Sequence, residues 1–197
     1  MALLKDKRLW AAALILALLL VMAAVDQSRL AYPIDPECAN LDAAVAAFYD
    51  RGYQTPRNVT VRLYDSVDIG RSRYVLCELG PELELGTVEL KRSLTGRYKI
   101  DHLSWGGGNF RFGTAEADGR TYLLAGGRNT ACRIGSLVFD LEGQICTLAL
   151  PASERFLVSA PLEAQPETRW PDISKVRVYD AQGLDITAQV DLSGGGI

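Results

Sequence analysis

The chain has 197 residues, of which 48% are hydrophobic and 23% charged, and its formal net charge is −3. This composition excludes a wholly disordered chain, a collagen-like chain and a disulfide-dense miniprotein. The length suits one domain together with an additional segment. Nothing in these quantities indicates an activity.

The additional segment stands at the front of the chain, where residues 9–25 form a run without a charge or a strongly polar side chain. As a helix this run would extend roughly 25 Å, a little less than the hydrocarbon core of about 30 Å. Lys5, Lys7 and Arg8 precede it. The positive-inside rule therefore predicts a cytoplasmic tail at 1–8, a transmembrane segment at 9–25 and an extracytoplasmic remainder.

A cleaved signal peptide is the main alternative, because residues 21–23 form a small-x-small cleavage site. The apolar run continues through Ala24 and Val25, which favours retention as a signal anchor. A buried helix of a cytosolic domain is the third interpretation. The first two make the protein a single-pass protein of the cell membrane or a secreted one, with everything after residue 25 outside the cytoplasm.

Charge limits the partners of the exported part. Once Lys5, Lys7, Arg8 and Asp6 are set aside, the chain keeps 18 basic and 23 acidic residues. This acidic balance argues against nucleic acid as a partner. The expected partners are the cytoplasmic membrane, through residues 9–25, and a protein outside that membrane.

Residues 26–35 form a short linker, and a helix is predicted over 36–51. Asp35 is a good N-cap and Pro36 suits the first helical position. Apolar residues then recur at spacings of three and four, which predicts one buried stripe. The stripe consists of Cys38, Leu41, Val45 and Phe48.

The chain after this helix alternates apolar and polar residues in short runs, which predicts strands. Asp118-Gly119 indicates a tight hairpin that would pair Thr114 with Leu123 and Phe112 with Ala125. Glu142-Gly143 indicates a second hairpin, pairing Phe139 with Cys146 and Leu137 with Leu148, and Gln182-Gly183 a third. The predicted fold is mainly β (α+β), with one amphipathic helix on an antiparallel meander sheet or a partly closed barrel. The β-rich domain would span 36–192, and the Gly-rich residues 193–197 would be a flexible tail.

Four cysteines follow the apolar run, and no two of them form a C-x-x-C pair. Four buried thiols are the simplest interpretation. In the second hairpin Cys146 would lie too far along the ladder to reach Cys132. If a disulfide forms, Cys38 on the helix and Cys77 on the adjacent sheet are the better pair.

Recognisable catalytic and metal-binding patterns are missing from the sequence. His102 is the single histidine, which excludes sites that need two imidazoles. Ser104 could share a strand face with His102, but G-x-S-x-G is absent. We therefore predict no catalytic residues, no metal ligands and no cofactor. Two Gly-Asn loops could form the rim of a binding surface, although plain hairpin turns explain them as well; the candidate binding residues are Trp105, Asn109, Arg111, Arg128 and Asn129.

Three segments, 96–100, 105–110 and 122–129, together with the basic N-terminus and single apolar span, carry a family resemblance. The chain resembles small membrane-anchored extracytoplasmic proteins of unknown function from Gram-positive bacteria. The resemblance implies a bacterial extracytoplasmic β-domain and brings no activity. The leading hypothesis is a membrane-tethered binding or accessory domain without catalysis. The alternatives are an exported hydrolase that uses scattered carboxylates or Ser104, and a structural component of an envelope assembly.

Overall fold

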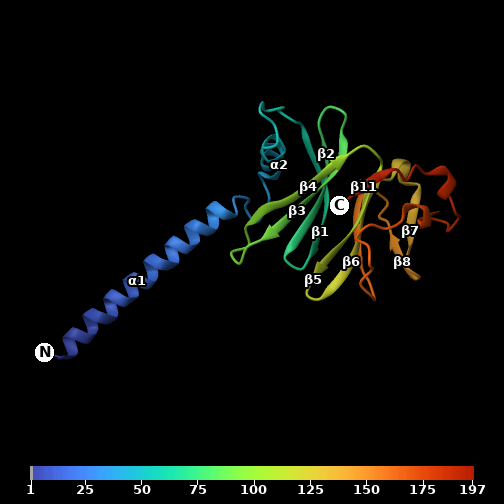
Figure 1. The fold of residues 1–197 in the computed structure, drawn as a ribbon. Helices are drawn as coiled ribbons and strands as arrows, with labels where there is room; N and C mark the ends of the chain where they lie inside the picture. The colour runs from blue at the N-terminus through green and yellow to red at the C-terminus, as the bar shows by residue number, and fades with distance from the viewer. Residues whose placement is uncertain (1) are drawn as a thin grey trace.

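A long helix projects from a β-rich body in the computed structural model, which describes residues 2–197 (Figure 1). Helix α1 spans Ala2–Ala31, and its described side chains are exposed. Its segment Trp10–Ala31 contains an 18-residue window with a mean hydropathy of 2.0. Among the described residues it is the one helix long and apolar enough to be a membrane span or a signal sequence.

The helix extends beyond the predicted span in both directions. It begins within the predicted tail 1–8, whose side chains lie outside the described ones, and it continues through residue 31. The predicted linker 26–35 therefore shrinks to the few residues after Ala31. The domain is joined to the helix almost directly.

Within residues 2–197, eleven strands form three sheets. Sheet A has the order β1-β2-β3-β4, sheet B the order β11-β5-β6-β9, and sheet C the order β10-β7-β8. The strands are β1 Val61–Ile69, β2 Ser72–Leu79, β3 Glu84–Arg92, β4 Tyr98–Gly106, β5 Phe110–Ala117, β6 Arg120–Arg128, β7 Ile134–Leu141, β8 Gln144–Ala149, β9 Arg155–Pro161, β10 Arg177–Asp180 and β11 Gly194–Gly196.

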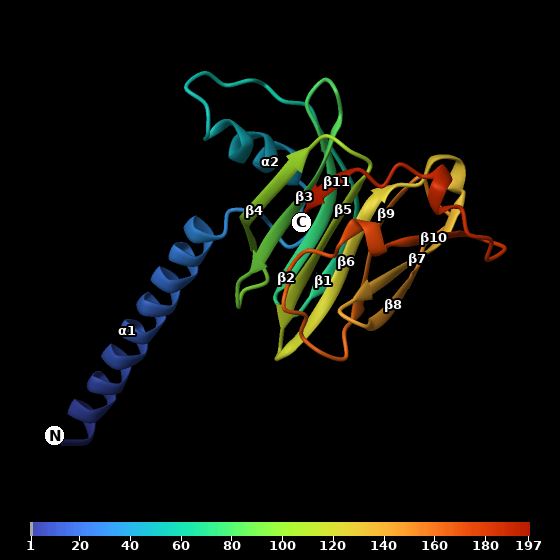
Figure 2. The same ribbon diagram turned by 45° about the vertical axis from the view of Figure 1, so that its right-hand side comes forward.

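Helix α2 (Leu41–Asp50) and the three sheets stack as successive layers, which Figure 2 shows from a second angle. One apolar cluster joins α2 to sheet A, a second joins sheet A to sheet B, and a third joins sheet B to sheet C. Alternation along the strands explains this, because successive side chains enter opposite layers. The predicted mainly β, antiparallel fold is confirmed, and the described sheets form open layers without a closed barrel.

Two predicted hairpins have the expected register. Thr114 pairs with Leu123 and Phe112 with Ala125 in β5–β6. Phe139 pairs with Cys146 and Leu137 with Leu148 in β7–β8. The third predicted hairpin keeps its turn at 180–183, but the returning chain makes only a single bridge, between Tyr179 and Asp185.

Helix α2 begins five residues later than predicted. Cys38 adopts a left-handed backbone with φ of 57°, which no α-helix accommodates. Asp35 still accepts a hydrogen bond from the Ala39 amide, but within a turn ahead of the helix. Leu41 and Val45 are buried as expected, whereas Phe48 is only half-buried.

The predicted flexible tail is instead strand β11, which pairs in parallel with β5. Glycine is required here because of close backbone approach: a Cβ atom on Gly194 would lie 1.9 Å from the carbonyl oxygen of Phe110. The absence of side chains lets β11 fit against β5. A composition typical of flexible tails thus serves close packing.

A buried ionic cluster joins sheet A to sheet B, and we name it the Glu78 cluster. The Glu78 side chain is 1% exposed. It accepts hydrogen bonds from Tyr64 Oη at 2.6 Å, Arg128 Nε at 2.9 Å and Arg155 Nε at 3.0 Å. Burial alone would raise the pKa of Glu78, but these three donors outweigh it and hold the pKa below its ordinary value.

We predict that Gly194→Ala detaches β11. The added Cβ would meet the Phe110 backbone, which cannot move aside as a side chain can. Overpacking of this kind costs about 1–3 kcal/mol. Hydrogen exchange at residues 194–197 should lose its protection. Gly107→Ala is the matched control, since a Cβ there meets nothing within 4 Å; equal protection in both variants would contradict the prediction.

We predict that Glu78→Gln destabilises the domain by about 3 kcal/mol at neutral pH, because two arginines lose their buried counter-charge. A carboxyl whose pKa is lowered by folding stabilises the folded state above its unfolded pKa of about 4.3, and loses that contribution as pH falls through the folded pKa. Urea unfolding from neutral to acid pH should therefore show the wild-type and Glu78→Gln free energies converging. A constant difference down to the acid limit would contradict this.

Candidate functional site

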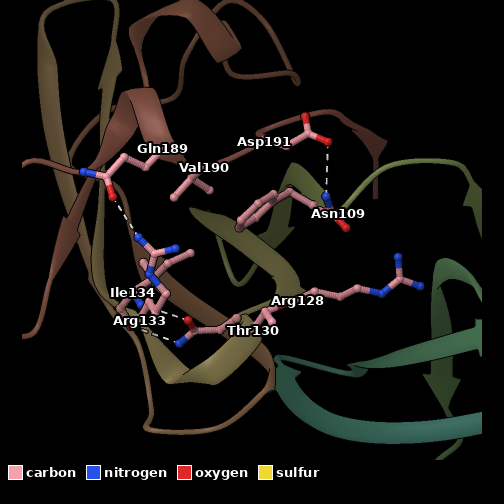
Figure 3. A pocket seen from close by; sticks show the side chains of 10 residues that line it. Asn109, Arg128, Thr130, Arg133, Ile134, Gln189, Val190 and Asp191 are labelled. Atoms are coloured by element: carbon pink, nitrogen blue, oxygen red, sulfur yellow. Dashed lines mark hydrogen bonds between the residues drawn. The ribbon is translucent and has the colours of Figure 1, made fainter.

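Three of the five predicted binding residues meet around one small cavity. Asn109, Arg128 and Asn129 line it together with residues of the 189–191 segment, and its volume is about 140 Å³ (Figure 3). Asn109 stands at the start of β5 and Asn129 just after β6, so the hairpin itself brings the two loops together. The β5–β6 hairpin therefore places the two Gly-Asn loops side by side.

The polar groups around this cavity already form hydrogen bonds with other groups of the protein. Asn129 is fully buried, and its amide exchanges hydrogen bonds with the Ile134 backbone at 2.8 and 3.0 Å. Asn109 donates to Asp191 at 3.2 Å, and Figure 3 shows Arg128 directed away from the cavity, where it meets the Glu78 cluster. These contacts hold loops in place and leave little chemistry for a ligand.

The other two predicted residues lie elsewhere. Arg111 is 3% exposed and donates to the carbonyl oxygens of Leu85 and Gly106, both at 2.6 Å, which ties β5 to β3 and β4. Trp105 packs on Tyr49 of α2, with ring centroids 4.9 Å apart. Both side chains hold neighbouring layers together and do not contribute to a shared binding surface.

A larger cavity, of about 340 Å³, lies between sheet A and the segments opposite it, and we name it the β3–β4 cleft. Sheet A contributes one face of β2, β3 and β4. Strand β5 and the segment 169–170 supply the opposite wall. The lining residues are Tyr74, Thr87, Glu89, His102, Thr114, Arg169, Trp170 and Ile197.

Strand register places the polar side chains of sheet A on the cleft face. Thr87 pairs with Ser104 across β3–β4, and Glu89 pairs with His102. Residues two apart on a strand share a face, so all four project from the same side of the sheet. Polar residues gather here because sheet B covers the β1–β2 part of this face more fully than the β4 part.

Glu89 is held in a defined orientation. Its Oε1 accepts hydrogen bonds from Tyr74 Oη at 3.1 Å, Ser72 Oγ at 3.2 Å and Lys91 Nζ at 2.5 Å. Burial raises the pKa of Tyr74 well above its ordinary value, and the Glu89 carboxylate adds to this, so the hydroxyl remains a donor. Oε2 accepts no hydrogen bond within the described residues.

Two buried hydroxyls on this face of sheet A have no partner among the described residues, Thr87 Oγ1 and Ser104 Oγ. Thr87 is 2% exposed and lines the cleft. A buried hydroxyl without a hydrogen bond costs about 1–3 kcal/mol. Unpartnered groups of this kind are typical of a site completed by a ligand or by water.

The cleft lacks an assembled reactive group. Ser104 Oγ receives no hydrogen bond from His102, although the two share a face as predicted. The described residues contain no group of three His, Cys, Asp or Glu side chains placed to hold a metal ion.

All four cysteines are free thiols in the structure. Cys38 and Cys77, the pair considered for a disulfide, belong to the same apolar cluster without being bonded. Burial raises the pKa of Cys77 to about 12, which leaves that thiol protonated and unreactive.

Among the residues on the cleft face, only His102 and Ser104 were considered in the sequence analysis, and the others escaped it because they lie in strands rather than loops. The alternation Thr87-x-Glu89 opposite His102-x-Ser104 places polar residues on one face of the two strands, while Val88 and Leu103 between them are apolar, and this pattern was the available indication. Comparison of the chain with protein-family models, curated proteins and solved structures finds no significant match. The residues of the cleft must therefore carry the functional argument by themselves.

Proposed function

We propose that this chain is a membrane-tethered, extracytoplasmic binding domain that holds a small polyhydroxylated ligand in the β3–β4 cleft. The observation that carries the proposal is the unpartnered hydroxyl of Thr87, which lines the cleft two residues along β3 from the Glu89 carboxylate. The unpartnered hydroxyl of Ser104 belongs to the residue opposite Thr87 in the β3–β4 ladder. The Thr87 hydroxyl would gain a hydrogen bond on binding.

The lining supports a sugar-like ligand. Hydroxyls, the Glu89 carboxylate and the His102 imidazole offer both donors and acceptors at short spacing. Trp170 is 54% exposed at the rim and offers a flat apolar surface for the C–H face of a sugar ring. A volume of about 340 Å³ lies at the lower end of ordinary ligand sites and fits one or two sugar units. A glycan of the cell envelope has this chemistry.

The tether supports the location. Helix α1 has the length and composition of a signal anchor, and the basic residues before it favour a cytoplasmic N-terminus. The domain would then stand outside the membrane, fixed to it by the helix. Bacterial origin belongs to the same proposal and rests on the resemblance alone.

Binding can be measured by ligand-detected NMR with N-acetylglucosamine, glucose and their β-linked disaccharides. The full chain would be held in nanodiscs, because glycosidic detergents would compete. Thr87→Val should weaken binding about fivefold through one lost hydrogen bond, and Trp170→Ala should weaken it about tenfold or more. Thr87→Val should not lower the free energy of unfolding, because it removes a hydroxyl that has no partner in the free protein.

Trp105→Ala is the matched control, since this tryptophan is also exposed but packs on α2. It should leave binding unchanged. No binding by any of the sugars, or equal binding by the Thr87→Val and unsubstituted chains, would contradict the assignment of the cleft.

Topology can be tested with a membrane-impermeant maleimide on intact cells. Both variants are made in a chain whose four native cysteines are replaced by serine, because those cysteines are free thiols and two are only half-buried. Gln182→Cys places a thiol on an exposed turn of the domain and should become labelled. Lys5→Cys, ahead of the span, should be labelled only after lysis. Labelling of the two variants in the opposite order would overturn the orientation, and a shortened chain that lacks residue 5 would show that the segment is cleaved.

A further inference from the structure

The turn between β3 and β4 lies alongside the membrane-spanning helix. Figures 1 and 2 show the turn directed toward the same side as the helix N-terminus. An open cavity of about 610 Å³ separates the two, with Val21, Val25 and Ala31 on the helix and Leu94 on the turn. Because an α-helix rises about 1.5 Å per residue, Val25 lies about 9 Å before Ala31 along the axis. The turn therefore reaches back to the level of the apolar run.

The position of the turn relative to the helix is fixed by hydrogen bonds. Arg97 donates to the carbonyl oxygens of Tyr32 and Pro33, both at 2.8 Å. Ile34, which is 1% exposed, exchanges backbone hydrogen bonds with Tyr98 at 3.0 and 2.9 Å. The base of the hairpin and the end of α1 are thus one connected unit.

Leu94 at the tip of this turn is 95% exposed. A single exposed leucine is ordinary on a protein surface. This one faces the same space as the apolar side of α1, with the cavity between them. In a bilayer that space would be filled by lipid, which would cover Leu94.

The surroundings of the turn carry unpaired positive charge. The three neighbouring acids are already paired: Asp68 forms a salt bridge with Arg73, Glu89 with Lys91, and Asp101 with Lys99. Arg71, Arg92 and Arg97 form no salt bridge within the described residues, and Arg71 donates only to the Arg92 carbonyl oxygen. Guanidinium groups beside a membrane-embedded apolar tip match the phosphates of anionic lipids.

We infer that the β3–β4 turn is a second membrane-contacting element. Leu94 enters the interfacial region of the bilayer that α1 spans, and Arg71 and Arg92 bind the headgroups of anionic phospholipids there. This inference rests on the proposed function, because it requires α1 to span a membrane.

The test uses the full chain reconstituted in phosphatidylcholine vesicles with brominated acyl chains, with and without phosphatidylglycerol. Bromine quenches indoles that reach the bilayer. Leu94→Trp adds one indole at the turn, and Leu184→Trp adds one at a distant turn where the leucine is 64% exposed. Bromination should quench the added fluorescence of Leu94→Trp and leave that of Leu184→Trp unchanged. Adding Arg92→Gln to Leu94→Trp should reduce the quenching in phosphatidylglycerol vesicles, whereas adding Arg177→Gln should not.

Native Trp10 separates the two ways of failing. If bromination quenches the unsubstituted chain through Trp10 but spares the indole of Leu94→Trp, the helix is inserted and only the inference is overturned. If the unsubstituted chain is not quenched at all, α1 does not span and the tether fails together with the inference. Quenching of Leu94→Trp that is equal with and without phosphatidylglycerol would overturn the proposed binding of headgroups by Arg71 and Arg92. It would still support the contact of Leu94 with the bilayer.

Discussion

The buried carboxylate of Glu78 holds sheets A and B together. It is buried between sheets A and B with Arg128, Arg155 and Tyr64 around it, and a charge in that position is stable only while its donors remain in place. The cluster lies near the C-terminal end of β2. Tyr74 is four residues earlier on the same strand, about 13 Å away. The charged side chains of the Glu78 cluster therefore join sheets A and B near one end of β2, and the β3–β4 cleft lies near the other end.

The features that the sequence predicts well are those set by local chemistry. A two-residue turn fixes a hairpin register, and a register error of one residue would move every apolar side chain to the wrong face. Asp118-Gly119 and Glu142-Gly143 are such turns, and the pairs around them are the predicted ones. The predicted start of α2 was wrong, because Cys38 adopts a left-handed backbone conformation despite the good N-cap and the proline ahead of it.

The features that the sequence does not predict depend on what lies in the next layer. Gly194 belongs to a composition that indicates flexibility, yet the Phe110 backbone opposite it makes glycine necessary for packing. Arg111 and Arg128 stand beside glycine-rich loops and suggest a binding rim, yet neighbouring carbonyls and Glu78 occupy them. Thr87 has no local feature of interest until the stacking of sheet B leaves its hydroxyl buried without a partner.

The short connection between α1 and the domain fixes the position of the cleft relative to the helix. Arg97 and the Ile34–Tyr98 bridge hold the helix end against β4, so the domain cannot swing on a flexible linker. Arg71, in the β1–β2 turn beside the β3–β4 turn, precedes Tyr74 by three residues, which places the cleft about 10 Å from this arginine. With the β3–β4 turn at the headgroups, the cleft would stand just above the bilayer surface. The two proposals taken together narrow the expected ligand to a polyhydroxylated group held close to the membrane, either on a lipid or on the innermost layer of an envelope glycan.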